Sequence, residues 1–391
     1  MKTNVECISR LLKEEKERRC LNETDWRNLS EMASNIAHIS FGNIVAGECD
    51  DEYKRKRTIW TLFGYETIKK LLEFDDTNVF TLTTMIIYNC LVENVMRKEC
   101  LNNEIYILLN ILLQNIARDE CASEWSLLTL ETFLKCENVL NFGYYRLQTK
   151  SRLVLLDVIY EMVKKISSSQ MHEHLISQSN LITIANLLSF NITDVFKLSS
   201  TKETTTTMAS ESLSPLEVSK MLTILCEVTS NSDHAKQFQQ KSLVENLLDT
   251  LKALHLLAKS DSPESVFKSI ATLREKNSTK EEELELSPTY GFKRNIIRLI
   301  TNLSYQCLDV QNWVREMDGI PLILDVCRLD ASNPYIMQWC IFAVRNLLEN
   351  NRENQSIVAS ISRDGTLIDS PLLRELGLQI VDGKITTYTK Q

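Results

Sequence analysis

Glycine and proline are scarce in this sequence. The 391 residues include 9 glycines and 6 prolines, and no proline precedes Pro215. Average usage would give about three to four times as many. Parallel α/β enzymes need glycines in their phosphate-binding loops, and all-β folds need turn residues about every 8–12 residues. The scarcity argues against both classes and predicts a chain that is mostly helix.

Recognisable catalytic patterns are also missing. The sequence has no Gly-x-Gly-x-x-Gly, no P-loop and no Gly-x-Ser-x-Gly, and it has only five histidines. His172-Glu173-His174 comes nearest to a metal-binding pattern, but on a helix its two imidazoles would point about 200° apart. We therefore expect no enzyme, no catalytic residues, no cofactor and no metal site.

Acidic residues outnumber basic ones, so the net charge is −8 and the isoelectric point is about 5.4. Nucleic-acid binders gain much of their affinity by neutralising phosphates, so this balance argues against that class. The one basic run, Lys54 to Arg57, follows an acidic stretch, and we interpret it as a solvated helix face.

No Cys-x-x-Cys pair occurs among the eleven cysteines, and most of them lie in apolar runs. This usage is typical of small buried side chains in a reducing compartment. The polar N-terminus, Met1 to Arg19, predicts no signal peptide. The longest uncharged stretch, 175–193, contains Asn180 and Asn186, which would be costly at bilayer depth. We expect a cytosolic protein without a membrane span.

A repeat is visible near the C-terminus. Residues 296–303 resemble residues 340–347 at an offset of 44, which lies in the armadillo and HEAT range; tetratricopeptide and ankyrin periods are near 33–34. The offset relates Asn302 to Asn346 within these segments, and two further pairs keep it beyond them: Gln311 and Gln355, and Val314 and Val358. Apolar stripes at helical spacing also cover 86–90, 155–162 and 221–228. The sequence therefore predicts an all-α, armadillo-like α-solenoid.

The turn residues of one repeat fit this layout. We expect Gly319 to end a short helix in the left-handed conformation and Pro321 to lie in the first turn of a second helix. Asn333 is expected to cap the long third helix.

Composition divides the chain into five parts. We predict N-terminal armadillo-like repeats over 1–196, a mobile Ser/Thr-rich loop over 197–214 and a further repeat over 215–258. An acidic, partly disordered excursion with a helix over 264–276 is expected at 259–286. The remaining part, 287–391, should hold repeats and a capping tail, with a helix over 372–377 and a hairpin about Asp382-Gly383.

The C-terminal part resembles the ataxin-10 family. The resemblance lies in Tyr290 to Leu303, in Asp318 to Leu324, in Asn333 to Leu347 and in Leu376 to Val381, in the same order along the chain. It covers roughly 287–391, whereas the first 286 residues match in helical texture and length. Thr301 stands where the family often has glycine.

The resemblance implies an armadillo scaffold without enzymatic activity. It further implies roles in cytokinesis, neuronal survival and neurite outgrowth, and a cytoplasmic location, with perinuclear or division structures as alternatives. Family partners would be a heterotrimeric G-protein β subunit or a glycosyltransferase. A homo-oligomer is left open.

Third helices line the groove of armadillo arrays, and their asparagine can bind a partner's backbone or brace the repeat. Both roles remain open here. Arginine beside asparagine would favour acidic groups at the C-terminal end, and glutamate in the middle repeats would favour basic or mixed-charge ligands. The predicted groove residues are Asn302, Asn346, Arg298, Arg345, Glu227, Glu161 and Asn89. The alternative is a cargo receptor of the nuclear-transport type, but its regular Trp and Asn ladder is absent from the sequence.

Overall fold

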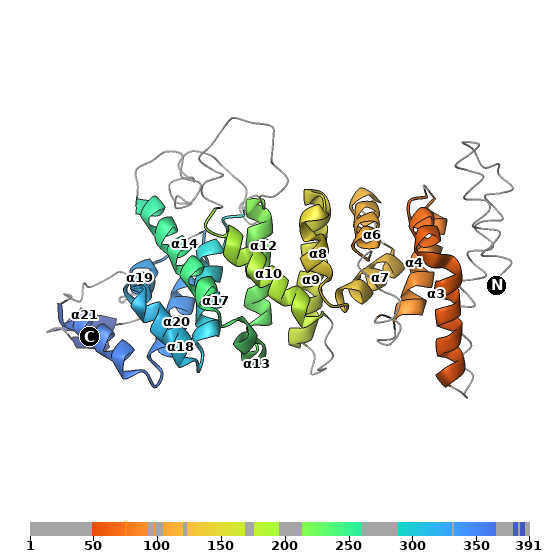
Figure 1. Cartoon of the computed structure of the whole chain (residues 1–391). Helices are drawn as coiled ribbons and strands as arrows, with labels where there is room; N and C mark the ends of the chain where they lie inside the picture. The colour runs from red at the N-terminus through yellow and green to blue at the C-terminus, as the bar shows by residue number, and fades with distance from the viewer. Residues whose placement is uncertain are drawn as a thin grey trace, which may run out of the picture. The chain divides into compact units, whose positions relative to one another are not determined.

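The computed structural model describes eleven stretches of the chain: residues 49–74, 76–92, 97, 105–119, 123–168, 176–194, 213–259, 288–330, 332–364, 378–381 and 384–387. They form two compact units, residues 1–237 and 238–391, which are described separately. Figure 1 shows the helices of each unit stacked in chain order.

Two rows of long helices make up the N-terminal unit. In one row α3, α6, α9 and α12 pack each on the next, and in the other α4 packs on α7. Helix α3 is kinked at Gly64, whose φ of 65° lies outside the helical range. Glycine adopts this left-handed conformation without strain because it has no Cβ. The helices are α3 (Cys49–Leu72), α4 (Thr77–Leu91), α6 (Ile105–Asp119), α7 (Glu124–Leu134), α8 (Val139–Gly143), α9 (Thr149–Ser168), α10 (Gln178–Asn191), α12 (Pro215–Val228) and α13 (Ser232–Ala235), with 3-10 turns η1 (Tyr144–Arg146) and η2 (Lys236–Phe238).

Hydrogen bonds between neighbouring repeats reveal the period of this unit. The Asn115 amide donates to Leu72 O at 3.2 Å, 43 residues away. Thr129 Oγ1 donates to Thr84 O across 45 residues, and the Asn180 amide donates to the carbonyl oxygen 46 residues earlier. These separations agree with the 44-residue period, which sequence similarity had revealed only at the C-terminus.

The ion pair between Lys220 and Asp157 joins α12 to α9 across 63 residues, 19 more than the period. The surplus is close to the length of the predicted Ser/Thr-rich loop, 197–214, which lies between these two helices in the sequence. Most of that loop, all of 260–287, His172 to His174 and the predicted helix over 372–377 lie outside the described residues.

Consecutive repeats of the C-terminal unit match in length and phase. The third helices α17 and α20 begin 44 residues apart and end 44 residues apart, and the first helices α18 and α21 begin 44 apart. The period predicted from the sequence is thus confirmed. The helices are α14 (Lys241–Lys259), α17 (Phe292–Ser304), α18 (Leu308–Glu316), α19 (Gly319–Val326), α20 (Ile336–Leu348) and α21 (Arg352–Asp364).

Gly319 does not end the short helix, contrary to the prediction. The left-handed residue is Asp318, with φ of 55°, and Gly319 already begins α19. Glycine is required there for a different reason: a Cβ would lie 2.7 Å from Val314 Cγ1 and 2.8 Å from its carbonyl oxygen. Pro321 lies in the first turn of α19, as predicted.

Asn333 does not cap α20, whose N-cap is Tyr335 with φ of 63°. The Asn333 side chain instead reaches the preceding third helix, α17, where Asn333 Oδ1 accepts a hydrogen bond from Arg294 N at 3.1 Å. That N–H lies in the first turn of α17, where helices lack internal acceptors. The asparagine thus caps a helix 39 residues earlier and joins two repeats.

Burial agrees with most of the other expectations. Cys90, Cys226 and Cys340 are buried and Cys307 is half-buried, and none of the six cysteines whose side chains the structure describes forms a disulfide. The basic run on α3 is only partly solvated, because Lys56 is 6% exposed. The aliphatic part of the Lys56 side chain is therefore buried in the protein, while the neighbouring Lys54 and Arg57 are exposed.

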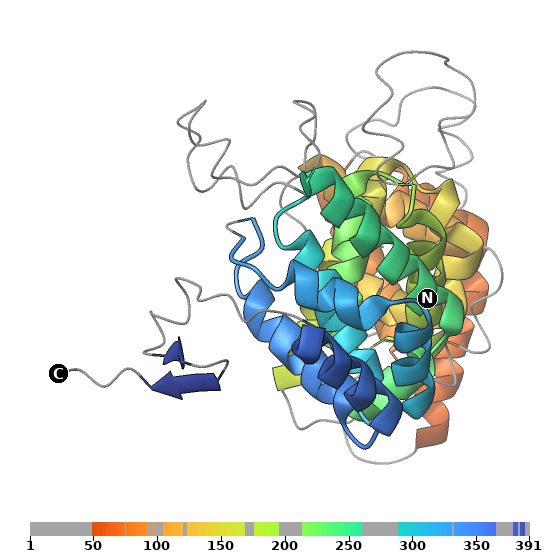
Figure 2. The ribbon, with the colours of Figure 1, turned by 90° about the vertical axis from the view of Figure 1, so that its left-hand side faces the viewer.

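A two-stranded antiparallel hairpin, β1 (Leu378–Val381) and β2 (Lys384–Thr387), follows the last helix, as predicted. Figure 2 draws its strands as two dark-blue arrows. Apart from this hairpin, the described chain is all-α, and its stacked repeats form the armadillo-like α-solenoid fold that the sequence predicts. Among the described residues, no helix combines the length and apolar character that a membrane crossing requires.

Candidate partner-binding face of the repeats

Asn346 is used to brace two repeats. Its amide donates to Thr301 O of α17 at 3.0 Å, and its own carbonyl oxygen accepts from the Gln311 amide at 2.9 Å. Asn346 therefore holds α20 against α17 and α18. Of the two roles left open for the predicted asparagines, the contacts of Asn346 match the bracing role.

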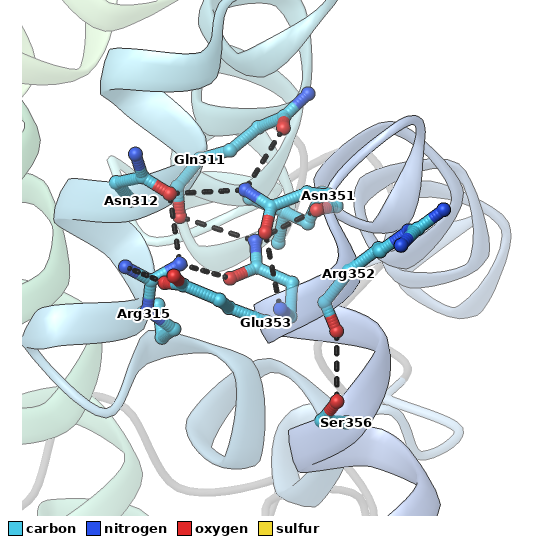
Figure 3. Close-up of polar contacts among 9 residues, drawn as sticks. Gln311, Asn312, Arg315, Asn351, Arg352, Glu353 and Ser356 are labelled. Carbon is cyan, nitrogen blue, oxygen red and sulfur yellow. Dashed lines mark hydrogen bonds and ion pairs between the residues drawn. The ribbon is translucent and has the colours of Figure 1, made fainter.

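A second polar cluster joins α18 to α21, and sequence analysis missed it (Figure 3). Asn354 is completely buried and donates to Leu347 O at 2.7 Å and to Gln311 O at 3.3 Å. Asn351 donates to Gln311 Oε1 at 3.2 Å and to Asn312 Oδ1 at 3.0 Å. The only sign of this cluster noted in the sequence is the 44-residue match of Gln311 with Gln355. A repeated glutamine does not reveal which groups its side chain hydrogen-bonds.

Arg315 closes this cluster at its solvent side. It contacts Asn354 Oδ1 at 3.1 Å and forms an ion pair of 2.6 Å with Glu353 of α21 (Figure 3). Glu353 is exposed, whereas Gln311, Asn351 and Asn354 are buried. Because its buried amides bind one another and the backbone, the cluster is a joint between repeats rather than a site open to a ligand.

A partly exposed aromatic and cationic surface lies where α17 meets α20, with Arg298 and Trp339 half-buried. The Arg298 guanidinium carbon stands 5.3 Å from the ring centre of Trp339, and Trp339 packs edge to face on Phe342 at 5.9 Å. Phe342 is 47% exposed. We call Arg298, Trp339 and Phe342 the open face. Its three side chains form one contiguous contact area of the type that proteins use to bind partners.

The other predicted groove residues have different surroundings. Asn302 is half-buried on α17 and Arg345 is exposed on α20. The repeat offset pairs Arg345 with Thr301, a residue that α20 covers, so Arg345 lies on the side of α20 that points away from α17.

In the N-terminal unit, Glu161 is exposed on α9 and Glu227 is half-buried on α12, two helices that pack together. Asn89 is 6% exposed within α4, so its side chain offers little surface to a partner.

A buried ion pair is the main polar feature of the N-terminal unit. Arg152 Nε lies 2.7 Å from Glu217 Oε1, and the two side chains are 4% and 0% exposed. The same carboxylate accepts from the Tyr144 hydroxyl at 3.2 Å, and its second oxygen accepts from Ser214 N. Burial and the neighbouring Glu217 carboxylate raise the pKa of Tyr144 far above its ordinary value. The pair joins η1, α9 and α12, and it is closed to solvent.

Two thiols of the C-terminal unit form a hydrogen-bonded pair. Cys327 follows α19 and is half-buried, and Cys340 lies in α20 and is buried. The hydrogen bond between them lowers the pKa of Cys327 to about 7. Burial raises the pKa of Cys136, in the N-terminal unit, to about 12. Within the described stretches, no group of three or more His, Cys, Asp and Glu residues could hold a metal ion.

Comparison with known proteins supports a relationship over most of the chain. The family described as spinocerebellar ataxia type 10 protein domain matches residues 292–387. Ataxin-10 of Xenopus tropicalis is 30% identical over 348 residues, which cover 88% of this chain and 67% of that protein. Human ataxin-10 is 29% identical over 349 residues and is covered to the same 67%.

Designed armadillo repeat proteins are among the solved structures that resemble the chain. The designed protein YIII(Dq)4CqI is 11% identical, with 88% of this chain and 99% of that chain covered and a TM-score of 0.26. The relationship to the ataxin-10 proteins is established by sequence identity over nearly the whole chain, and the C-terminal unit contains the family's domain. This chain belongs to the ataxin-10 family.

Proposed function

We propose that this protein is a non-catalytic scaffold that binds protein partners through the open face, Arg298, Trp339 and Phe342. The observation that supports the proposal is the exposure of Phe342 beside a stacked tryptophan and arginine. Aromatic residues and arginine contribute most of the binding energy in protein interfaces. A surface of this composition therefore suits a protein ligand.

The open face favours a partner segment in which a carboxylate lies beside apolar side chains. The Arg298 guanidinium lies over the Trp339 ring, and arginine's planar, pre-organised donors suit a carboxylate. Phe342 supplies apolar contact next to it. Because the Asn346 amide is engaged with Thr301, binding at this face depends on arginine and aromatic contacts more than on a ladder of asparagines.

The N-terminal unit offers a different chemistry. Its predicted groove residues Glu161 and Glu227 are acidic, and the exposed carboxylate of Glu161 would attract a basic segment. We propose that each unit has its own partner preference, acidic for the C-terminal unit and basic for the N-terminal unit.

The wider roles rest on membership of the family. We propose that the scaffold acts in cytokinesis and in neuronal survival or neurite outgrowth, and that it works in the cytoplasm, at perinuclear or division structures. A G-protein β subunit and a glycosyltransferase are the partner classes that the family resemblance suggests. The function of this chain is proposed to be assembly rather than catalysis.

A peptide array tests the binding chemistry. Full-length protein is applied to ten-residue peptides that combine Asp or Glu with Leu or Phe, and to matched peptides in which Lys replaces the acids. We expect acidic peptides to bind, and Arg298→Ala/Phe342→Ala to weaken this binding at least tenfold. The control is Leu256→Ala, an exposed apolar residue of α14 that is outside the open face. Equal binding by the double variant, or a preference for the lysine peptides, would overturn the proposal for this face.

A further inference from the structure

The C-terminal repeats cover one face of α17 completely. Lys293, Ile297, Ile300 and Ser304 follow one another at helical spacing, and their exposures are 8%, 0%, 0% and 0%. This face lies on the side where α20 packs, since α17 and α20 contact each other and the Asn346 amide of α20 reaches Thr301 O. A third helix is thus buried by the third helix of the next repeat.

The matching face of α20 is more apolar and is not covered in this way. The 44-residue offset relates the four residues above to Met337, Ile341, Val344 and Leu348, which we call the terminal stripe. Ile341 is 61% exposed, although its counterpart Ile297 is fully buried, and the other three are half-buried. Among the described residues, α21 packs on α20 and Ile341 still remains exposed. Four apolar residues at spacings of four, three and four normally indicate a buried helix face.

In the sequence, the hairpin occupies the position at which the next third helix would be expected. Counting 44 residues on from 334–343, which includes the first half of α20, gives 378–387, the two strands and their turn. The 14 residues from Asp364, at the end of α21, to Leu378 can span at most about 45 Å, enough to reach a neighbouring helix. The match to the family's domain ends at Thr387, the last residue of β2. The hairpin is therefore part of the repeat domain.

An isolated two-stranded hairpin is at best marginally stable in water, so this one needs a surface to pack against. Its register pairs Ile380 with Ile385 and Leu378 with Thr387, and along β1 apolar Leu378 and Ile380 flank polar Gln379. Such alternation is typical of a strand with one face on an apolar core. The alternating apolar residues of the hairpin sequence therefore match the apolar character of the terminal stripe, in which Ile341 is exposed.

We propose that the hairpin β1–β2 packs on the terminal stripe of α20 and closes the stack of repeats in place of a further third helix. A tethered segment acts at an effective concentration in the millimolar range, which favours it over a second copy or a separate partner at micromolar levels. Stacked repeats need such a cap, because an open end exposes apolar surface. The cap lies on the side of α20 away from α17, so it leaves the open face accessible.

Hydrogen–deuterium exchange on the full-length chain tests this docking. We expect the amides of the two strands to be protected, and Ile341→Asp to raise their exchange rate at least tenfold. The matched control is Leu256→Asp, because Leu256 is a 59% exposed apolar residue of α14 and should leave the hairpin unchanged. Ile341→Leu should keep the protection, since it preserves the apolar contact. Dilution by twentyfold should have no effect on an intramolecular contact.

Three outcomes would overturn the proposal. Hairpin amides that exchange equally fast in the wild type and in Ile341→Asp would show that the hairpin does not use the stripe. Protection that falls on dilution would assign the stripe to a second copy of the chain. Protection that appears only in cell extract would assign it to another protein. Amides of α17 report whether a variant is folded, and Ile341→Gln is the milder substitution should the aspartate perturb them.

Discussion

The two units join their repeats with different polar chemistry. In the N-terminal unit a charged pair, Arg152 and Glu217, is buried between α9 and α12. In the C-terminal unit the buried part of the corresponding joint consists of neutral amides, with Asn354 fully buried and bound to two backbone carbonyls, and the Arg315–Glu353 ion pair lies at its solvent side. A buried charge must keep its partner, whereas a neutral amide loses only its own hydrogen bonds when it is replaced. The N-terminal joint should therefore be the more sensitive to a single substitution.

The largest effect is expected from breaking the buried ion pair. Arg152→Ala leaves the Glu217 carboxylate buried without its counter-charge, so the free energy of unfolding should fall by about 3–5 kcal/mol. Replacing both residues with apolar ones, as in Arg152→Met/Glu217→Leu, should restore only part of that loss, because the Tyr144 hydroxyl and Ser214 N then lose their acceptor. Urea denaturation followed by circular dichroism measures both variants. A loss below about 1 kcal/mol for Arg152→Ala would remove the proposed difference between the units.

A smaller loss is expected from the neutral joint. Asn354→Ala removes both donated hydrogen bonds and leaves two carbonyls inside the protein, which should cost about 1–3 kcal/mol. Gln355→Ala is the matched control, because the neighbouring glutamine also donates to a backbone carbonyl but is exposed; its effect should stay within about 0.5 kcal/mol. The same denaturation experiment compares them. Equal effects of the two substitutions would mean that burial of the Asn354 amide does not increase its contribution to the free energy of unfolding.

The amide braces should behave alike in both units and so sharpen the comparison. Asn115→Ala in α6 and Asn346→Ala in α20 each remove a hydrogen bond to the preceding repeat, and each should cost about 1 kcal/mol. Thermal unfolding of the single variants and of the double variant would measure this, with additive losses expected for distant sites. A much larger loss of stability for one of the two variants would show that its unit depends more strongly on the asparagine hydrogen bond between repeats.

The smallest effect concerns reactivity rather than stability. A thiol with pKa lowered to about 7 is half thiolate near neutral pH, so alkylation of Cys327 by iodoacetamide should accelerate between pH 6 and 8 and then level off. Cys136, with pKa raised to about 12, should stay unmodified up to about pH 9. Mass spectrometry of digests taken across this pH range measures both. Cys340→Ala removes the hydrogen-bond donor and should slow Cys327 at neutral pH, and an unchanged rate would contradict the role of the thiol pair.

The repeat is easier to predict from the amino-acid sequence than the joints between repeats. The 44-residue offset of Asn302 and Asn346 predicted both the period and the third helices, because periodic apolar residues specify which helix faces are buried. Whether these asparagines bind a ligand or brace the repeat could not be decided from the sequence, and the structure shows the Asn346 amide bound to Thr301 O. An amide can equally bind a partner or a neighbouring backbone, and only the position of the next helix distinguishes these roles.

Two turn residues show the same limit more sharply. Gly319 was expected to supply a left-handed φ, but it is required because Val314 leaves no room for a Cβ. Asn333 was expected to cap the helix that follows it, but it caps α17. In both cases the residue type predicted a local constraint, and the constraint came from a helix in another part of the repeat.

The sequence by itself determined the helical class, the repeat period and the membership of the ataxin-10 family. These follow from local propensity and from patterns along one chain. Tertiary structure alone decided that Arg152 and Glu217 are buried together, that Arg298 lies over Trp339 and that Ile341 is exposed where Ile297 is buried. Contacts between residues 41 to 65 positions apart depend on how helices stack, and the same amphipathic pattern is compatible with many partners for each side chain.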